Sequence, residues 1–188
     1  MKFTQLAIPD VVLIEPRMFG DERGWFMESY NERQFREGLA ALGLSVPDGF
    51  VQDNHSCSQR GVLRGIHYQL PPHAQGKLVR VTRGAVFDVA VDLRRTSPTF
   101  GRWVGNTLTA ENRKQLWIPA GFGHGFLSLE DTTVFLYKTT DYYAPNCERS
   151  VLWNDPTLAI SWPLAEGTGP MLADKDASAP KLADADLP

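Results

Sequence analysis

Short apolar runs separated by glycine and proline follow one another along most of this chain. The sequence contains 16 Gly and 13 Pro, and the runs between them are rich in Val, Leu, Thr and Phe. Such regular punctuation favours an all-β sandwich or barrel over a helical fold. It predicts enough strands for two packed sheets. The predicted strands are 11–15, 25–30, 61–68, 77–83, 85–93, 102–109, 114–118, 124–129, 132–140 and 158–162.

One segment carries a helical pattern instead. Phe35, Leu39 and Leu42 share one face at helical spacing. Asn31 precedes them as a residue type that caps a first turn, and Gly43 follows them as a residue type that ends a helix. We therefore predict one helix, packed on the outside of the sheets.

The length and charge of the chain limit its architecture and its partners. A chain of 188 residues can build a substantial core, so we predict a single domain over 1–188 with a C-terminal extension from about residue 163. The extension is rich in Ala, Asp and Pro, a composition that predicts a loosely ordered tail. The net charge of −3 gives no indication of nucleic-acid binding, because the 19 basic residues are outnumbered and scattered.

The apolar runs and the cysteines indicate the compartment. The longest apolar runs are far shorter than the roughly 20 residues that cross a bilayer, and the N-terminus lacks the apolar stretch of a secretory signal. The two cysteines, Cys57 and Cys147, are too few for a disulfide framework. We expect a reduced, cytoplasmic protein with no membrane or nucleic-acid partner.

Alternation within two predicted strands indicates which side chains share a face. In 85–93, apolar residues occupy every second position, and the positions between them include Asp88 and Asp92. This period of two is typical of a half-buried strand. In 77–83 the same period places Lys77 on the face of two valines. A charge beside valines lies at the end of a sheet or lines a polar cavity inside a small β-barrel.

The segment RGVLRGIHYQ, residues 60–69, interrupts a strand-like run with charged and titratable side chains. A regular strand would send Arg64 and His67 to opposite faces, because their positions differ by an odd number. Gly65 between them tolerates the bulge that would bring both to one side. We therefore predict a β-bulge near Gly65 and a shared polar face.

The histidines do not follow a metal-binding pattern. Barrels of this size often bind a metal through clustered histidines and a carboxylate, yet the partner position after His67 is Gln69. His124 has a suitable place for a third ligand, or closes a Pro-Gly turn as a polar residue. His55 and His73 show no ligand-like spacing, and we assign them to structural or loop roles. We predict no bound metal.

Tyr137 and His67 together fit acid–base chemistry. Alternation places Tyr137 on the face of Phe135 and Thr139, where a core aromatic residue is the simplest interpretation for a tyrosine alone. Near pH 7, however, a neutral imidazole can accept a proton and a phenol can donate one. A base and an acid on opposite sides of one carbon are what inversion of a C–H centre requires.

Three basic residues gain significance from this pair. Arg23, Arg64 and Lys77 would each be surface charges if considered alone. Two guanidinium groups near a carbon acid would suit a substrate that is bound through the diphosphate of a nucleotide. A lysine ammonium could stabilise an enolate oxygen.

The segments that carry these residues resemble one known family. They are EPRMFGDERGWFMESY, FVQDNHSCSQRGVLRGIHYQ, KLVRVTRGAVFDVAVDLR, FGRWVG, QLWIPAGFGHGFLSL, YKTTDYYAP and WNDP. Together they closely resemble the dTDP-4-dehydrorhamnose 3,5-epimerase family from about residue 3 to 162, with a fainter match at LADKD near the C-terminus. The resemblance implies a cupin-type jelly-roll β-sandwich with a few short peripheral helices. It also implies a cytoplasmic homodimer that works without metal or cofactor.

The resemblance further implies a reaction and its participants. The reaction is epimerisation of C3 and C5 of the 4-keto sugar in dTDP-4-dehydro-6-deoxy-D-glucose, on the route to dTDP-L-rhamnose. His67 would be the general base and Tyr137 the general acid. Lys77 would hold the enolate oxygen, and Asp176 of LADKD would orient the base.

Substrate contacts are implied in the same way. Arg23 and Arg64 would contact the diphosphate, Tyr143 would stack on the thymine, and Phe26 would pack nearby. In the family the segment 23–28 reaches the site of the neighbouring subunit, which would make the dimer part of the active site. The other residues expected around nucleotide or sugar are Glu28, Gln52, Asn54, His124, Glu148 and Lys175.

Three alternatives stay open from the sequence. An epimerase of a single centre, C3 or C5, keeps the same His–Tyr pair. A non-catalytic cupin that binds sugar nucleotides would not need that pair. A metal-dependent cupin oxidoreductase would contain a stoichiometric metal.

Overall fold

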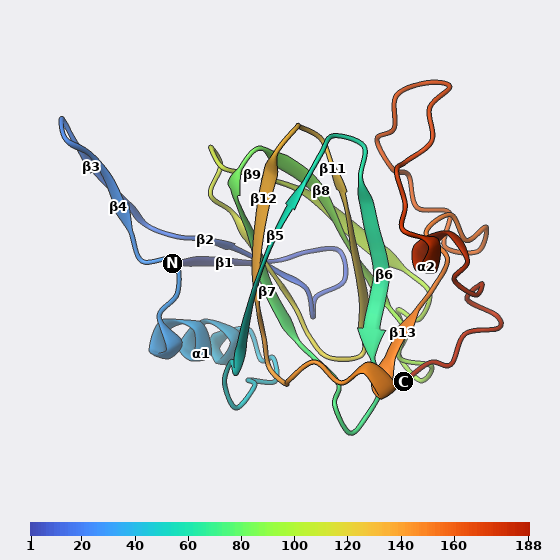
Figure 1. Ribbon diagram of the computed structural model, residues 1–188. Coiled ribbons are helices and arrows are strands. Elements are labelled where there is room, and N and C mark those ends of the chain that lie inside the picture. The colour runs from blue at the N-terminus through green and yellow to red at the C-terminus, as the bar shows by residue number, and fades with distance from the viewer.

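Two antiparallel sheets form the body of the molecule, which a computed structural model describes over residues 1–188 (Figure 1). One sheet has the strand order β1-β2-β10-β7-β12-β5, and the other has the order β13-β6-β11-β8-β9. The strands of the six-stranded sheet are β1 Lys2–Gln5, β2 Val12–Glu15, β10 Gln115–Ile118, β7 Lys77–Arg83, β12 Thr133–Thr139 and β5 Gln52–Ser58. Those of the five-stranded sheet are β13 Glu148–Ser150, β6 Leu63–Gln69, β11 Phe122–Ser128, β8 Ala85–Asp92 and β9 Trp103–Thr109. The fold class is therefore the predicted all-β, jelly-roll sandwich.

The main core lies between the two sheets. It contains Val79 and Val81 from one sheet and Val86 and Ala90 from the other, all of them buried. Alternation along each strand directs these side chains inward. Polar side chains on the same strand faces also point into the interior. Lys77 is one of them and lines a polar cavity, which is one of the two arrangements expected for it.

A separate hairpin and the helix α1 lie at the N-terminal side of the sandwich. β3 (Met18–Asp21) and β4 (Gly24–Met27) pair only with each other and project from the body (Figure 1). α1 (Glu32–Ala41) begins as predicted, with the side chain of Asn31 accepting a hydrogen bond from the backbone N–H of Gln34 at 3.1 Å. Its buried Phe35 and Leu39 cover the outer face of the six-stranded sheet.

The strand predictions are incomplete at several places. The segment 158–162 is not a strand but irregular chain that packs against the five-stranded sheet. The predicted strand 25–30 is the second half of the β3–β4 hairpin and ends at Met27. β1, β3, β5 and β13 were not predicted. They are short or polar, so they lack the apolar run that indicates a strand.

The C-terminal extension is ordered by packing, so the prediction of a loosely ordered tail is wrong. Leu182 and Ala185 are buried against the outer face of the five-stranded sheet. The buried carboxylate of Asp155 accepts the backbone N–H of Leu182 at 2.8 Å and those of Thr157 and Leu158 at 2.8 and 3.0 Å. These bonds hold an Ala- and Pro-rich chain that has little hydrophobic surface of its own.

This cover also corrects the prediction for 85–93. The strand β8 is buried on both faces, not on one. Val89 and Val91 face outward and lie beneath the C-terminal segment, whereas Asp88 and Asp92 share the inward face with Ala90. Each aspartate therefore needs a partner inside the protein.

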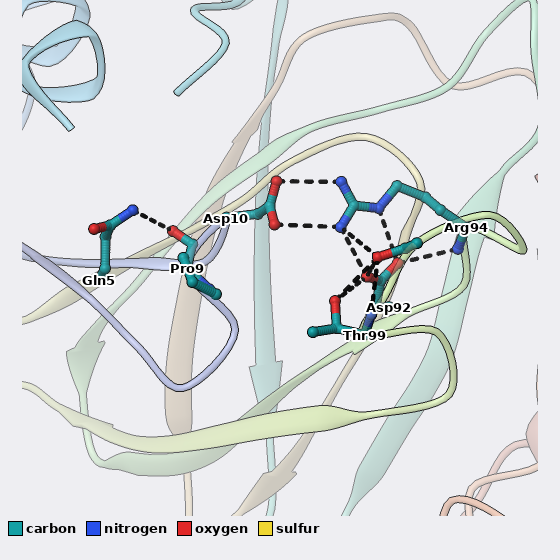
Figure 2. Close-up of polar contacts among 7 residues, drawn as sticks. Gln5, Pro9, Asp10, Asp92, Arg94 and Thr99 are labelled. Atoms are coloured by element: carbon teal, nitrogen blue, oxygen red, sulfur yellow. Dashed lines mark hydrogen bonds and ion pairs between the residues drawn. The ribbon is translucent and has the colours of Figure 1, made fainter. Parts of the chain in front are cut away.

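Asp92 finds its partners at one end of the sandwich (Figure 2). It accepts hydrogen bonds from the hydroxyls of Ser97 and Thr99 at 2.5 and 2.6 Å and from the guanidinium of Arg94 at 2.7 Å. Arg94 also reaches Asp10 in the loop after β1 at 3.2 Å. Burial favours the neutral acid, but these donors lower the pKa of Asp92 to about 2. The network joins the end of β8 to the β1–β2 and β8–β9 loops, and none of its residues lines the cavity described below.

No helix in residues 1–188 is both long enough and apolar enough to span a membrane.

Candidate active site

A cavity of about 330 Å³ opens between the two sheets and gathers most of the residues singled out from the sequence. This volume is at the lower end of the range for small-molecule sites. Nine of the predicted site residues line it, with five others. They are Asn54, Arg64, His67, Lys77, His124, Tyr137, Glu148, Lys175 and Asp176, together with His55, Ser56, Phe126, Phe135 and Ala173.

The bulge predicted near Gly65 is present in β6. Across the β6–β11 pair, His67 is opposite His124 and Arg64 is opposite Phe126, so two residues of β6 face one residue of β11. Gly65 has a φ of 120°, a backbone conformation that residues with a side chain rarely adopt. A Cβ atom there would lie 2.5 Å from the Cα of Gly125. The bulge lets one strand direct both Arg64 and His67 into the cavity.

His67 is paired with a carboxylate from the C-terminal segment. Asp176 belongs to the short helix α2 (Asp174–Ala177), is 2% exposed, and places Oδ1 2.5 Å from Nε2 of His67. Backbone hydrogen bonds of Met171 with Gly61 and Leu63 hold the segment against the start of β6. With Nε2 donating to the carboxylate, Nδ1 of His67 has the free lone pair that a base needs.

Tyr137 enters the cavity from the opposite sheet. Its strand β12 lies between β7 and β5, where Tyr137 is opposite Val79 and Asn54. Burial raises the pKa of its phenol, while the charge of Arg64 acts in the opposite direction. The phenol therefore keeps its proton near neutral pH and can donate it.

Lys77 and His124 lie deeper in the cavity. Lys77 is 8% exposed, and its ammonium donates to the backbone carbonyl of His67 at 3.3 Å. Burial lowers the pKa of Lys77 to about 8, against the effect of Asp88 and Glu148. His124 is in β11, where its Nε2 lies 2.9 Å from Oδ2 of the buried Asp88. It is therefore a strand residue, and not the residue that closes a turn.

Polar side chains connect the mouth of the cavity. Glu148 accepts a hydrogen bond from Lys175 at 3.2 Å and from the hydroxyl of Tyr143 at 3.1 Å. Although burial favours the neutral acid, these donors lower the pKa of Glu148. Gln52 contacts Asn54 at 3.0 Å and the backbone N–H of Tyr143 at 3.0 Å. Gln52 and Tyr143 thus flank the cavity without lining it.

Three predicted substrate contacts lie away from the cavity of their own chain. Arg23, Phe26 and Glu28 are in or just after the β3–β4 hairpin, and all three are exposed. Arg23 forms an ion pair with Asp21 at 2.5 Å within the turn. Phe26 is 65% exposed and contacts no core cluster.

The lining residues that the sequence analysis missed follow from strand alternation. Ser56 is two positions after Asn54, Phe126 two after His124, and Phe135 two before Tyr137. Phe126 and Phe135 stack with ring centroids 4.3 Å apart and form an apolar wall. His55 was assigned a structural or loop role. It is an exposed residue of β5 that also borders the cavity.

No group of three or more His, Cys, Asp or Glu side chains is placed so that it could hold a metal ion. The polar groups of the cavity are instead arranged as pairs: two imidazoles that each contact a carboxylate, with a lysine and a phenol from the other sheet. Such an arrangement can remove a proton on one side of a bound molecule and deliver one on the other.

Known proteins share this sequence and fold over their whole length. The dTDP-4-dehydrorhamnose 3,5-epimerase of Pseudomonas aeruginosa is 61% identical over 186 residues, which are 99% of this chain and 98% of that protein. The crystal structure of dTDP-6-deoxy-D-glucose-3,5-epimerase from Legionella pneumophila, in complex with dTDP-4-keto-L-rhamnose, matches with a TM-score of 0.91 and 50% identity. The match covers 100% of this chain and 97% of the Legionella chain.

A relative of different specificity has the same fold. The crystal structure of ChmJ from Streptomyces bikiniensis, a 3'-monoepimerase in complex with dTDP-quinovose, matches with a TM-score of 0.85 and 40% identity. The match covers 95% of this chain and 87% of the ChmJ chain. The sequence model of the dTDP-4-dehydrorhamnose 3,5-epimerase family matches residues 5–184. The chain therefore belongs to the dTDP-4-dehydrorhamnose 3,5-epimerase family.

Proposed function

We propose that this protein epimerises C3 and C5 of the sugar in dTDP-4-dehydro-6-deoxy-D-glucose to give dTDP-4-dehydro-L-rhamnose, a step of dTDP-L-rhamnose biosynthesis. Both carbons flank the C4 ketone, so that loss of either proton gives an enolate. The observation that carries the proposal is the meeting of His67 and Tyr137, from opposite sheets, in one cavity. A base and an acid on two sides of a ring are what inversion demands.

His67 is the general base in this proposal. Its Nδ1 removes the proton from C3 or C5, and the positive charge that develops on the ring is stabilised by Asp176 at 2.5 Å. The electron pair of the broken C–H bond moves into the enolate, whose oxygen accepts a hydrogen bond from the ammonium of Lys77. No cofactor is needed for either transfer.

Tyr137 completes each inversion. Its phenol donates a proton to the other face of the enolate carbon, after which solvent restores the protonation of both groups. Arg64 and the groups at the cavity mouth, Asn54, Glu148 and Lys175, are the proposed contacts to diphosphate, nucleotide and sugar. Tyr143, which borders Glu148, is the proposed stacking partner of the thymine.

Proton exchange in heavy water tests the reaction. The enzyme is incubated with dTDP-4-dehydro-6-deoxy-D-glucose in deuterium oxide, and the sugar is analysed by NMR. We expect deuterium at both C3 and C5 and a product of inverted configuration at both. A His67→Asn variant is the matched control, because it keeps the fold and a polar side chain but lacks the base.

The second candidate is a single-centre epimerase, favoured by the similarity to the 3'-monoepimerase ChmJ. The same exchange experiment separates the two. Deuterium at C3 alone, even after prolonged incubation, establishes the single-centre reaction and overturns the proposal of two inversions. Binding of the sugar nucleotide without any exchange would instead establish a non-catalytic protein.

We further propose that the protein is a cytoplasmic homodimer whose hairpin segment 23–28 completes the neighbouring site. The exposed aromatic residues of the projecting hairpin support this: Phe19, Trp25 and Phe26 are 49%, 58% and 65% exposed. Arg23 lies in the turn of this hairpin, where it would exchange its ion pair with Asp21 for the phosphates of a substrate that is bound in the partner. The residues 1–188 are proposed to act as one domain within each subunit.

Mixing two inactive variants tests the shared site. His67→Ala has no base but an intact hairpin, and Arg23→Ala has an intact cavity but an altered hairpin. In a mixed dimer, the Arg23→Ala subunit keeps its base and receives an unaltered hairpin, so we expect activity to reappear on mixing. The two variants carry different affinity tags, so that mixed dimers can be isolated by two successive purifications. If these mixed dimers have no activity above the separate variants, the hairpin does not contribute in this way.

A further inference from the structure

A second buried carboxylate beneath the cavity has no role in the mechanism above. Asp88 lies in the middle of β8 and is 0% exposed. Its Oδ2 contacts Nε2 of His124 at 2.9 Å, whereas Oδ1 is buried and has no hydrogen-bond donor from the protein. A buried carboxylate with an unpartnered oxygen costs folding free energy. Packing therefore does not explain a carboxylate at this position, and the chemistry of the cavity is the alternative.

Asp88 determines which nitrogen of His124 can accept a hydrogen bond. Burial lowers the pKa of His124, against the opposing effect of Asp88, so the ring is neutral near pH 7. The nitrogen that faces the carboxylate, Nε2, then carries the hydrogen. Nδ1 forms no hydrogen bond within the chain and is not fully buried. Because His124 lines the cavity, Nδ1 is accessible from it.

This assignment limits what His124 can do. A neutral ring with its hydrogen on Nε2 can accept a hydrogen bond from a hydroxyl at Nδ1, but it cannot donate one to a carbonyl or enolate oxygen. The donor for that oxygen has to come from elsewhere in the cavity. Lys77 has three N–H groups, of which one donates to the carbonyl of His67 and two remain. The two residues are therefore suited to different atoms of one sugar ring.

Asp88 also acts on Lys77 through its charge. Burial lowers the pKa of Lys77 to about 8, and Asp88 is the larger of the two charges that raise it, with Glu148 the other. Other titratable or charged groups also line the cavity. They are His55 on β5, Arg64 and His67 on β6, Tyr137 on β12, and Lys175 and Asp176 on α2. With a pKa of about 8, Lys77 is mostly in its ammonium form near pH 7.

We propose that Asp88 is a positioning residue: it fixes His124 as an acceptor for a hydroxyl of the sugar ring. The sugar as ligand rests on the proposed function, whereas the state of the His124 ring does not. In this arrangement Lys77 donates to the C4 oxygen and His124 reads a neighbouring hydroxyl. Lys77 and His124 would then distinguish hydrogen-bond acceptors from donors on the sugar while keeping their own protons.

The hydrogen on His124 is observable directly in the unaltered, ligand-free protein. Two-bond proton–nitrogen NMR correlations distinguish the two neutral forms of a histidine ring, and a His124→Gln variant identifies the signals. We expect His124 to be neutral near pH 7 with its hydrogen on Nε2. A ring with its hydrogen on Nδ1, or a charged ring, overturns the proposal whatever reaction the enzyme catalyses.

The Asp88→Asn variant tests the contribution to activity, with Asp92→Asn as its matched control. Both aspartates are fully buried on the same face of β8, but Asp92 contacts the loop network of Arg94, Ser97 and Thr99. We expect Asp88→Asn to lower kcat about 10- to 100-fold, by analogy with the loss of a carboxylate that orients a metal-binding histidine. The basic limb of its pH–kcat profile should move to lower pH, because Lys77 loses its proton more easily.

Asp92→Asn should lower thermal stability and leave the shape of the pH profile unchanged. An Asp88→Asn enzyme whose kcat and pH profile match those of Asp92→Asn would overturn the proposal, since Asp88 would then be only structural. If Asp88→Asn does not fold, the NMR measurement on the unaltered protein still decides between the two forms of His124. An inactive unaltered protein would count against the proposed function and not against the assignment of that ring.

Discussion

Replacing Gly65 with alanine tests whether the bulge in β6 is what brings Arg64 and His67 into one cavity. The new Cβ would lie 2.5 Å from the Cα of Gly125 and 2.6 Å from the carbonyl oxygen of His124. Both are backbone atoms of the paired strand β11, so neither can rotate away. The contact can be relieved only if the two strands separate by about 1 Å, because ordinary contacts of a Cβ atom are 3.4–4 Å.

The size of the effect follows from two contributions. Overpacking costs about 1–3 kcal/mol, and a φ of 120° adds strain of about 1–3 kcal/mol for a residue with a side chain. We therefore expect the free energy of unfolding to fall by about 2–6 kcal/mol, which lowers Tm by about 4–24 °C for a chain of this length. A displacement of about 1 Å at His67 should lower kcat about 100-fold.

Gly61→Ala is the matched control for this experiment. Gly61 also has a positive φ, of 82°, but a Cβ atom there meets nothing within 4 Å. Gly61→Ala should therefore cost only the backbone strain, which lowers the free energy of unfolding by about 1 kcal/mol and Tm by about 2–4 °C. The measurements are thermal unfolding by circular dichroism and deuterium exchange into the sugar. A Gly65→Ala protein that keeps full activity and a Tm like that of Gly61→Ala would refute the reasoning about the bulge.

Three further predictions concern the acid–base pair and the loop network. Asp176→Asn should lower kcat by about 10²- to 10⁴-fold with little change in KM, because the imidazolium that forms on His67 loses its carboxylate; an equal change in KM would indicate a binding role instead. Tyr137→Phe should still exchange deuterium into the sugar in heavy water but form inverted product about 10²- to 10⁴-fold more slowly, since only the acid is missing; loss of exchange and inversion together would contradict this. The pKa of Asp92 is about 2 in the folded protein, below its ordinary value of 3.8. Its contribution of about 2 kcal/mol to stability is therefore present above pH 4 and is lost as the pH falls toward 2. Urea unfolding at several pH values should show this loss, and Asp92→Asn should lack that part of the pH dependence.

Several elements could be predicted because one local signal determined each. Asn31 caps α1, and the apolar spacing after it gives a single face for packing. The odd spacing of Arg64 and His67 around Gly65 predicts the bulge without any tertiary information. In such cases the backbone geometry leaves few alternatives, so the sequence pattern suffices.

Burial of β8 on both faces could not be predicted, because it depends on a distant segment. Alternation shows that Asp88 and Asp92 share a face, but it does not show which face is inward. The outer face is covered by a chain whose Ala and Pro content indicates disorder, and the bonds to Asp155 that order this chain exist only in the folded protein. Composition alone is therefore a poor guide wherever a few buried hydrogen bonds hold a segment.

The strand β5 shows why the site itself misleads a prediction based on hydrophobicity. Its sequence, QDNHSCS, contains no apolar run, yet it pairs with β12 along its whole length. Asn54 and Ser56 point inward because that part of the interior is a polar cavity and not packed core. A strand that lines a binding site must place polar groups where other strands place valine, so it loses the pattern by which strands are recognised. The same reasoning applies to Lys77 and Asp88 inside the sandwich, and it makes an unexplained charge on an inward face a better indicator of function than a motif on the surface.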